Sequence, residues 1–317
     1  MKRLKLIPLL TILAVLSGCN NVSAKEPSFG TMGDQVSKTE FDKRFQKVQN
    51  ECEFAKEDIK FGDRVFSFST IQSTYRSTKN GSKEKEKSES KTASAYERRY
   101  DFDNLVIKYT SNETVSAKTD TQEGNGTLNS TEKKELQYQY GAMDGEEYLF
   151  EINLKTKSYV KDQMVNENGA SNETADGIMR SMLNSDISYA LISYNNEVPF
   201  SEDMIKNCTY YANNTIFTIV YHKDEAVYES SGGSRFAKRT STADLKLQID
   251  FQEGKEAIRL SETNKTTREY TRGYDGYVAD DVAVNETKRS FEITITAENV
   301  DEKAVNLSKY SYIENAE

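Results

Sequence analysis

The stretch YERRYDFDNLVIKY, residues 96–109, decides the fold class of this chain. Its aromatic and aliphatic side chains alternate with charged ones, and the alternation is broken at Asp103 and Asn104. Successive side chains of a β-strand point to opposite faces of a sheet. The pattern therefore predicts two antiparallel strands joined by a turn, with one apolar face and one wet face.

The same period of two recurs along the chain. Asp144-Gly145 separates two alternating runs and is a favoured hairpin turn, because both positions tolerate positive φ. Those two runs contain Leu136 and Phe150, and further alternating runs contain Phe66, Leu247, Ile258 and Phe291. Residues 216–221 are almost fully apolar, which suggests a strand buried on both faces. The chain has no Trp, only 3 Pro and as many as 19 Tyr, a composition that favours strands over a helical bundle.

Two segments show helical spacing instead. In residues 39–54 the apolar positions recur every three or four residues, with Thr39 as the expected cap, and residues 174–194 show a similar one-sided pattern. Together these features predict an α+β fold that is mostly antiparallel β, with two helices covering the apolar face of the sheet.

The order helix, strands, helix, strands leaves two organisations open. Residues 38–170 and 171–317 could be two similar halves, each of a usual domain size. One long sheet interrupted by a helix fits the same pattern. Both alternatives place residues 38–317 in a single β-rich region.

Two polar segments, residues 77–94 and 116–134, interrupt the alternation. Segments of this composition bury little apolar surface to offset the entropy lost on ordering. We expect solvated, mobile hairpin loops here; the alternative is that one of them binds a partner.

The first 18 residues have the organisation of an export signal. Lys2, Arg3 and Lys5 precede an apolar run over residues 6–16, which is too short to span roughly 30 Å of hydrocarbon. Residues 1–18 are therefore expected to be removed. Residues 19–37 are polar and aperiodic, as in a flexible stalk.

Leu16-Ser17-Gly18-Cys19 resembles the lipobox of bacterial lipoproteins. The resemblance implies that the Cys19 sulfur receives a diacylglyceryl group, that the signal peptide is cut ahead of it, and that the lipid holds the protein on the extracytoplasmic face of the cell membrane. The alternative is an ordinary secreted protein cut after Val22-Ser23-Ala24.

Net charge excludes one class of partner. The whole chain carries −9, and loss of the three cations of the signal peptide leaves about −12. An acidic surface of this kind repels nucleic acid.

The residues favour no catalytic, metal or cofactor site. His222 is the only histidine, no Gly-x-Ser-x-Gly element is present, and His222 is expected at a strand end. The carboxylates of Asp275, Asp280, Asp281 and Glu286 do not have the spacing of a calcium loop. Whether Cys52 and Cys208 form a disulfide stays open, because a pair distant in sequence cannot be assigned without geometry.

The stretches YGAMDGEEYLF (140–150) and NLKTKSYVK (153–161) resemble the paired hairpins of LolA/LppX-like bacterial lipoproteins. The resemblance implies a strongly curved antiparallel sheet, a half-barrel, closed by helices over a cavity that carries lipids or lipoproteins. Helices 39–54 and 174–194 would be the lids.

Two functions follow as expectations. The first is a membrane-anchored extracytoplasmic lipoprotein that binds a lipid, a lipoprotein or another apolar ligand without catalysing a reaction. The alternative is an interaction or adhesion module without a ligand cavity, which meets a surface protein or the cell wall.

Overall fold

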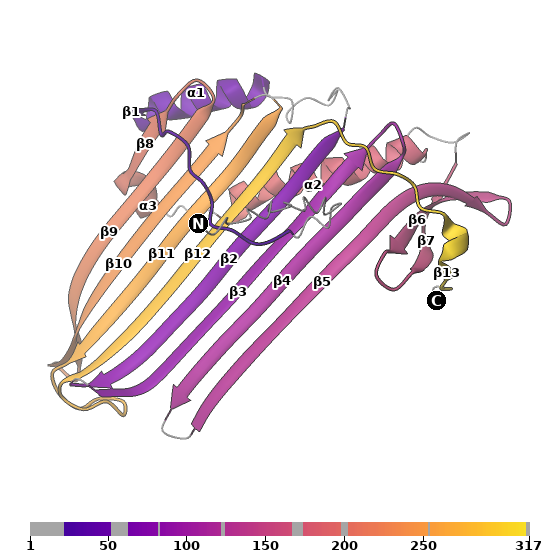
Figure 1. Cartoon of the computed structure of the whole chain (residues 1–317). Coiled ribbons are helices and arrows are strands. Elements are labelled where there is room, and N and C mark those ends of the chain that lie inside the picture. Colours follow the sequence, from indigo (N-terminus) through magenta and orange to yellow (C-terminus); the bar gives the residue numbers. More distant parts are fainter. Residues whose placement is uncertain are drawn as a thin grey trace, which may run out of the picture.

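The computed structural model describes residues 22–51, 63–81, 83–121, 124–166, 174–197, 202–252 and 254–314. These residues form one 13-stranded sheet with the order β1-β8-β9-β10-β11-β12-β2-β3-β4-β5-β6-β7-β13 (Figure 1). All neighbours pair antiparallel except β13 and β7, which pair parallel. The prediction of a mostly antiparallel β fold with few helices is confirmed.

The elements have the following bounds. The helices are α1 (Lys38–Glu51), α2 (Ala175–Glu197), α3 (Glu202–Asn207) and the 3-10 helix η2 (Leu307–Lys309). The first strands are β1 (Asp34–Val36), β2 (Arg64–Asn80), β3 (Lys83–Asp101), β4 (Val106–Thr121), β5 (Gly124–Met143), β6 (Glu146–Asn153) and β7 (Ser158–Val165). The remaining strands are β8 (Cys208–Ala212), β9 (Ile216–Ser231), β10 (Ser234–Asp250), β11 (Lys255–Tyr270), β12 (Asp281–Ala297) and β13 (Ser311–Tyr312).

The alternating stretch 96–109 forms the ends of β3 and β4 that face each other. Tyr100 pairs with Ile107 across the ladder, and Leu105 closes the turn with a φ of 51°. The hairpin at Asp144-Gly145 also forms as predicted, with φ values of 58° and 86° at the two turn residues. At Asp144-Gly145 the turn chemistry and the period of two agree, which fixes the register. In the first hairpin the positive φ falls on Leu105, a residue that disfavours it, so the register there follows from the alternation.

One ladder joins the two groups of strands. β12 pairs with β2 along its whole length, from Asp281 opposite Asn80 to Ala297 opposite Arg64. Strands from residues 38–170 and from residues 171–317 therefore lie in a single sheet. A relationship between the two halves stays a prediction.

The half-barrel curvature expected from the sequence is not confirmed, because the sheet stays open and is not strongly curled (Figure 1). The central strands β2 to β5 have 16 to 20 residues each. At about 3.3 Å per residue such strands are roughly 55 to 65 Å long. Much of that length is polar on both faces, so no continuous apolar face drives closure around a ligand.

The helix face is the side of the sheet that carries Phe66, Tyr100, Phe217 and Leu247, and it contacts α1 and α2. The Phe41 ring of α1 lies 5.5 Å from the Phe217 ring in an edge-on arrangement. Helix α1 starts one residue earlier than predicted, since Ser37 rather than Thr39 accepts a hydrogen bond from the Glu40 amide at 3.2 Å. The amphipathic pattern found in the sequence thus points into the main core.

Helix α2 covers the same face closer to β3 and β4. The Thr174 hydroxyl accepts a hydrogen bond from the Gly177 amide at 3.0 Å and caps the helix. Its residues Ile178, Met179 and Leu183 are buried. Both helices expected as covers therefore lie on one face, near one end of the long strands (Figure 1).

The prediction that the two polar segments are mobile hairpin loops is wrong, because both segments form strands. Residues 77–94 lie in β2 and β3, and residues 116–134 lie in β4 and β5, apart from the turns between them. The apolar halves of the two hairpins set the register. Each residue pair added beyond them forms ladder hydrogen bonds and costs little further loop-closure entropy. Thr-rich strands and charge pairs such as Lys87 with Glu89 at 2.7 Å support this extension.

Candidate functional site

The strap face is the side of the sheet opposite the helices, and it carries Ser69, Gln139 and Gln248. Two extended segments cross it: the N-terminal strap, residues 22–33, and the C-terminal strap, residues 298–310. Figure 1 shows both segments in front of the strands, with α1 and α2 behind them. Residues 22–36 were expected in a flexible stalk. They are instead held on the sheet, first as the N-terminal strap and then as β1.

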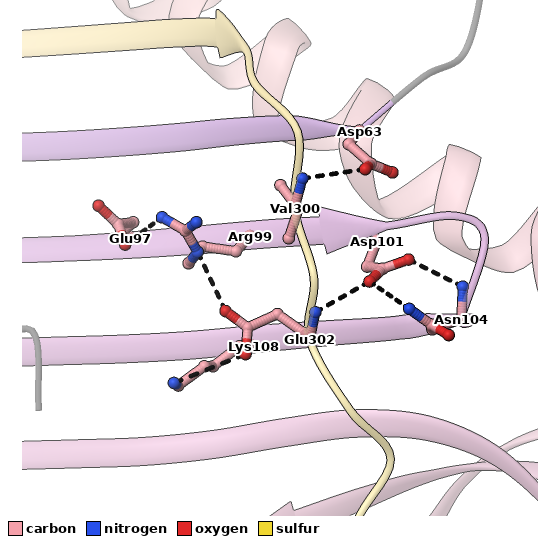
Figure 2. A network of polar contacts seen from close by, with 8 residues as sticks. All are labelled: Asp63, Glu97, Arg99, Asp101, Asn104, Lys108, Val300 and Glu302. Atoms are coloured by element: carbon pink, nitrogen blue, oxygen red, sulfur yellow. Dashed lines mark hydrogen bonds and ion pairs between the residues drawn. The ribbon is translucent and has the colours of Figure 1, made fainter. Parts of the chain in front are cut away.

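The C-terminal strap is fixed by acidic side chains at the ends of β2 and β3 (Figure 2). The Val300 amide donates to Asp63 Oδ2 at 3.0 Å, and the Glu302 amide donates to Asp101 Oδ2 at 2.9 Å. The Glu302 carboxylate in turn accepts from Arg99 Nε at 3.0 Å. Main-chain and side-chain groups of the strap are therefore both bound.

Two buried glutamines of β5 hold the next part of this strap. Gln137 Nε2 donates to the Lys303 carbonyl at 3.1 Å. Gln139 bonds twice to one residue: it accepts from the Val305 amide at 2.7 Å and donates to the Val305 carbonyl at 3.0 Å. The strap ends in β13, which adds to the edge strand β7.

The N-terminal strap is held by the same kind of double contact. Ser69 Oγ accepts from the Lys25 amide at 2.9 Å and donates to the Lys25 carbonyl at 3.1 Å. Gln248 accepts from the Gly30 amide at 2.8 Å and donates to the Gly30 carbonyl at 3.4 Å. Ser69, Gln139 and Gln248 thus each form hydrogen bonds with both the amide and the carbonyl of one strap residue.

The alternation of apolar and polar residues alone would place Gln137, Gln139 and Gln248 on a wet face, so these main-chain contacts were not predicted. All three glutamines are at most 4% exposed. Their signal in the sequence is the residue type: uncharged amides stand where other strands carry Lys or Glu. A buried amide needs partners for both its donor and its acceptor.

Beyond the straps, the strap face is open and forms a groove of about 680 Å³. Its lining residues are Ser73, Thr74, Tyr75, Glu89, Ser90, Lys91, Ser116, Ala117, Lys118, Thr127, Asn129, Glu286 and Lys288. A smaller hollow of about 140 Å³ shares Ser73, Lys91 and Lys288 with this groove and is also lined by Glu26 of the N-terminal strap. The groove therefore continues up to the strap.

Two acidic side chains of the groove, Glu286 and Glu89, are held in ion pairs along single strands. Lys288 Nζ lies 2.9 Å from Glu286, and Lys87 Nζ at the rim lies 2.7 Å from Glu89. The hydrogen bond with Lys87 lowers the pKa of Glu89, and the same bond raises the pKa of Lys87. Both shifts keep each group in its ordinary charged form.

His222 lies on the strap face of β9 rather than at a strand end. Its Nδ1 is 2.6 Å from Asp244 and its Nε2 is 3.1 Å from Asp224. The hydrogen bond with Asp244, followed by that with Asp224, raises the pKa of His222. In the part of the chain that the structure describes, both ring nitrogens face carboxylates rather than a serine or cysteine side chain.

The acidic residues examined for calcium binding do not converge. Asp281 is buried, binds Lys85 Nζ at 2.9 Å and accepts from the Val278 amide at 3.0 Å. That amide, more than Lys85, lowers the pKa of Asp281. Glu286 instead belongs to the groove. Among the described residues, no three His, Cys, Asp or Glu side chains are grouped as metal ligands.

Of the three cysteines, the structure describes one. Cys208 is half-buried at the start of β8, and burial raises the pKa of its thiol. Cys19 and Cys52 lie outside the described residues, so lipidation and a disulfide stay predictions. No described helix has the length and hydropathy of a membrane span.

A buried polar cluster attaches α2 to the sheet. Asp186 of α2 accepts a hydrogen bond from Tyr100 Oη at 2.6 Å and forms an ion pair with Arg98. Burial raises the pKa of both Asp186 and Tyr100. The helix expected as a lid is therefore held by charge as well as by apolar packing.

Comparison with known proteins gives no family. No family model and no curated protein matches the chain. A solved structure described as "Lipid-protein interactions in lipovitellin" is similar over 77% of this chain, with 11% identity and a TM-score of 0.30. The chain spans about a quarter of that protein, 26%. A similarity of this size supports no functional conclusion.

Proposed function

We propose that this protein is a bacterial lipoprotein, anchored by lipid on Cys19 at the extracytoplasmic face of the cell membrane, and that it binds a partner on its strap face without catalysing a reaction. The observation that carries the proposal is the open groove of about 680 Å³ next to two straps that the same face already holds.

The groove has the chemistry of a binding surface. Its hydroxyl, amide, ammonium and carboxylate groups stand on paired strands, which position them more rigidly than loops would. Catalytic acids and bases need pKa values near the working pH. Lys87 and Glu89 are shifted the opposite way, which supports binding rather than proton transfer.

The tether would bring this face close to the membrane. Lys25, where the strap is hydrogen-bonded to Ser69, is six residue steps after Cys19. Fully extended, they reach about 20 Å. A lipid on Cys19 would therefore hold the strap face within roughly that distance of the head groups.

Site-specific photo-cross-linking in intact cells tests the binding role. A photoreactive residue at Ser116, exposed in the groove, is expected to form adducts of defined mass. The matched control is Thr92, equally exposed on the helix face beyond the helices. No adduct at Ser116, or the same adducts at both positions, would contradict the proposal.

A lipid or other apolar ligand is the second candidate function. The observation that favours it is the apolar cluster of the helix face, over which α2 is held through the polar contacts of Asp186. Native mass spectrometry of protein extracted from its own membrane checks this candidate. A bound lipid that is lost on replacing Met179 or Leu183, and kept on changing the groove, would favour it over the first.

A further inference from the structure

We propose that the groove binds an extended acidic segment of another polypeptide, laid across the strands alongside the N-terminal strap. This inference rests on the proposed function and names the class of partner. It comes from three features of the strap face: its contacts with main-chain groups, the row of side chains beside the strap, and the charge of that row.

The strap face already binds extended polypeptide that runs across its strands. Lys25 lies at Ser69 on β2 and Gly30 lies at Gln248 on β10, with β12 and β11 between them. Neighbouring strands lie about 4.8 Å apart. The span of three such steps, roughly 14 Å, fits the five residues from Lys25 to Gly30 in extended form.

A second row of side chains runs parallel to this strap inside the groove. Register places the following residues opposite one another on β11, β12, β2, β3, β4 and β5: Thr263, Lys288, Ser73, Lys91, Ser116 and Asn129. Four of the six carry a hydroxyl or an amide. These are the same kinds of group that hold Lys25, Gly30 and Val305.

One buried polar atom beside this row lacks a partner among the described residues. It is Ser290 Oγ, two residues along β12 from Lys288, and Ser290 lines the hollow next to the strap. A buried polar atom without a hydrogen bond destabilises the fold. An N–H or C=O group of an extended chain would supply the missing hydrogen bond.

The charge of the row selects acidic side chains. Its only ionic groups are Lys288 and Lys91, which flank Ser73 from the neighbouring strands. Lys91 forms no ion pair within the described part of the chain, and the Glu26 side chain of the strap lines the same hollow. Lys288 is paired with Glu286 at 2.9 Å, so Lys91 is the cation of the row that an acidic partner residue would meet without breaking an ion pair.

Binding of a synthetic peptide to the purified, full-length lipidated protein in detergent micelles tests the inference. The probe is an end-blocked peptide of alternating Glu and Ser, about eight residues long, because six strands span roughly 24 Å. The expected result by fluorescence anisotropy is salt-sensitive binding of this peptide and none of the Lys/Ser peptide. Methylation of alternate peptide nitrogens is expected to weaken binding by roughly tenfold or more.

A double variant, Lys91→Glu with Lys288→Glu, is expected to weaken binding by roughly tenfold or more. The control is Lys134→Glu with Lys223→Glu, which makes the same charge change on the helix face. Circular dichroism melts of both variants verify folding. A further variant, Ser73→Val, keeps all charges and is expected to weaken binding by removing one hydroxyl.

Several results would overturn the inference. The control variant could lose as much peptide binding as the Lys91 and Lys288 variant. The N-methylated peptide or polygalacturonate could bind as tightly as the Glu/Ser peptide. The protein could also bind phosphatidylglycerol vesicles and not the peptide. Self-association of the protein that depends on Lys91 and Lys288 would overturn it as well. If cross-links at Ser116 persist while the peptide does not bind, this inference fails and the proposed function stands.

Discussion

Gln139 holds Val305 by both of its main-chain groups, through an accepted hydrogen bond of 2.7 Å and a donated one of 3.0 Å. Ser69 holds Lys25 and Gln248 holds Gly30 in the same way. The straps are therefore bound to the sheet through contacts that do not depend on the side chains of the strap. This mode of contact connects the fold to the proposed binding role.

Replacing Gln139 with Leu is expected to release the C-terminal strap. The variant leaves the Val305 amide and carbonyl without their partners and removes the acceptor of Gln137. The expected loss is about 2 kcal/mol in the free energy of unfolding, measured by urea denaturation. The amide of Val305 should also exchange with solvent faster.

Gln72→Leu is the matched control, because Gln72 is exposed on the helix face of β2. It is expected to change stability by roughly 0.5 kcal/mol or less. A Gln139 variant as stable as this control would show that the double contact contributes nothing to strap binding.

Asp186 is expected to make the attachment of α2 depend on pH. Burial raises its pKa in the folded protein, so the folded state holds the proton more tightly than the unfolded state. The stability that this group contributes is fully present below its unfolded pKa, and is lost as the pH rises through the folded pKa. Asp186→Asn should therefore flatten the pH dependence of the melting temperature in the weakly acidic range.

Removing the Asp186 side chain is expected to lower the free energy of unfolding more than neutralising its charge does. Asp186→Ala leaves the half-buried Arg98 without its ion-pair partner and Tyr100 Oη without its acceptor, for which a loss of about 2 kcal/mol is expected. Asp176→Ala is the control, since its pair with Arg180 is on the surface of α2, and roughly 0.5 kcal/mol is expected there. Equal losses in the two variants would contradict the role given to the buried cluster.

His222 is expected to titrate above its ordinary pKa of 6.5, because Asp244 and Asp224 hydrogen-bond its ring. As the only histidine, it gives a single Cε1–H resonance by NMR, which can be followed without assignment of other histidines. A raised histidine pKa stabilises the fold at pH values below the unfolded pKa, and this contribution is lost as the pH rises through the folded value. Asp244→Asn should lower the pKa. Glu225→Gln, on the opposite face of β9, should leave it unchanged.

The sequence predicted the parts of the fold in which periodicity and burial agree. Stretch 96–109 and the Asp144-Gly145 hairpin show this, because one face of each is apolar, and at Asp144-Gly145 the turn residues also accept positive φ. The polar halves of β2 to β5 escaped prediction for a physical reason. These polar halves are ordered by ladder hydrogen bonds that continue from the apolar half of each strand. Main-chain hydrogen bonds leave no apolar pattern in the sequence.

The candidate site was even less visible. The groove joins residues from β12, β2, β3, β4 and β5, and only the register brings them to one level. Ser73 has nothing in its local sequence to mark it. Eight of the 13 lining residues, however, lie in the polar segments 77–94 and 116–134, for which partner binding was the alternative to mobile loops. Of the acidic residues considered for calcium binding, Glu286 alone lines the groove, and it does so beside Lys288 rather than in an acidic cluster.

The proposed lipid on Cys19 would place the strap face at the membrane. Lipidation of Cys19 stays a prediction. Cys19→Ala is expected to move the protein from the membrane fraction to the medium or to leave an uncut precursor, because the lipid is the proposed anchor. Two acyl chains give lasting attachment, at about 0.8 kcal/mol per buried methylene. Cys208→Ala is the control and should stay in the membrane, since that thiol is half-buried in β8.

Mass spectrometry of the mature amino terminus separates the two cleavage sites. A diacylglyceryl cysteine at position 19 leaves the whole N-terminal strap in place. A cut after Ala24 would instead start the chain at Lys25, so that the amide bonded to Ser69 would become a free amine. Membrane attachment that survives Cys19→Ala, or a mature chain beginning at Lys25, would contradict the lipoprotein assignment and would free the strap face from the membrane.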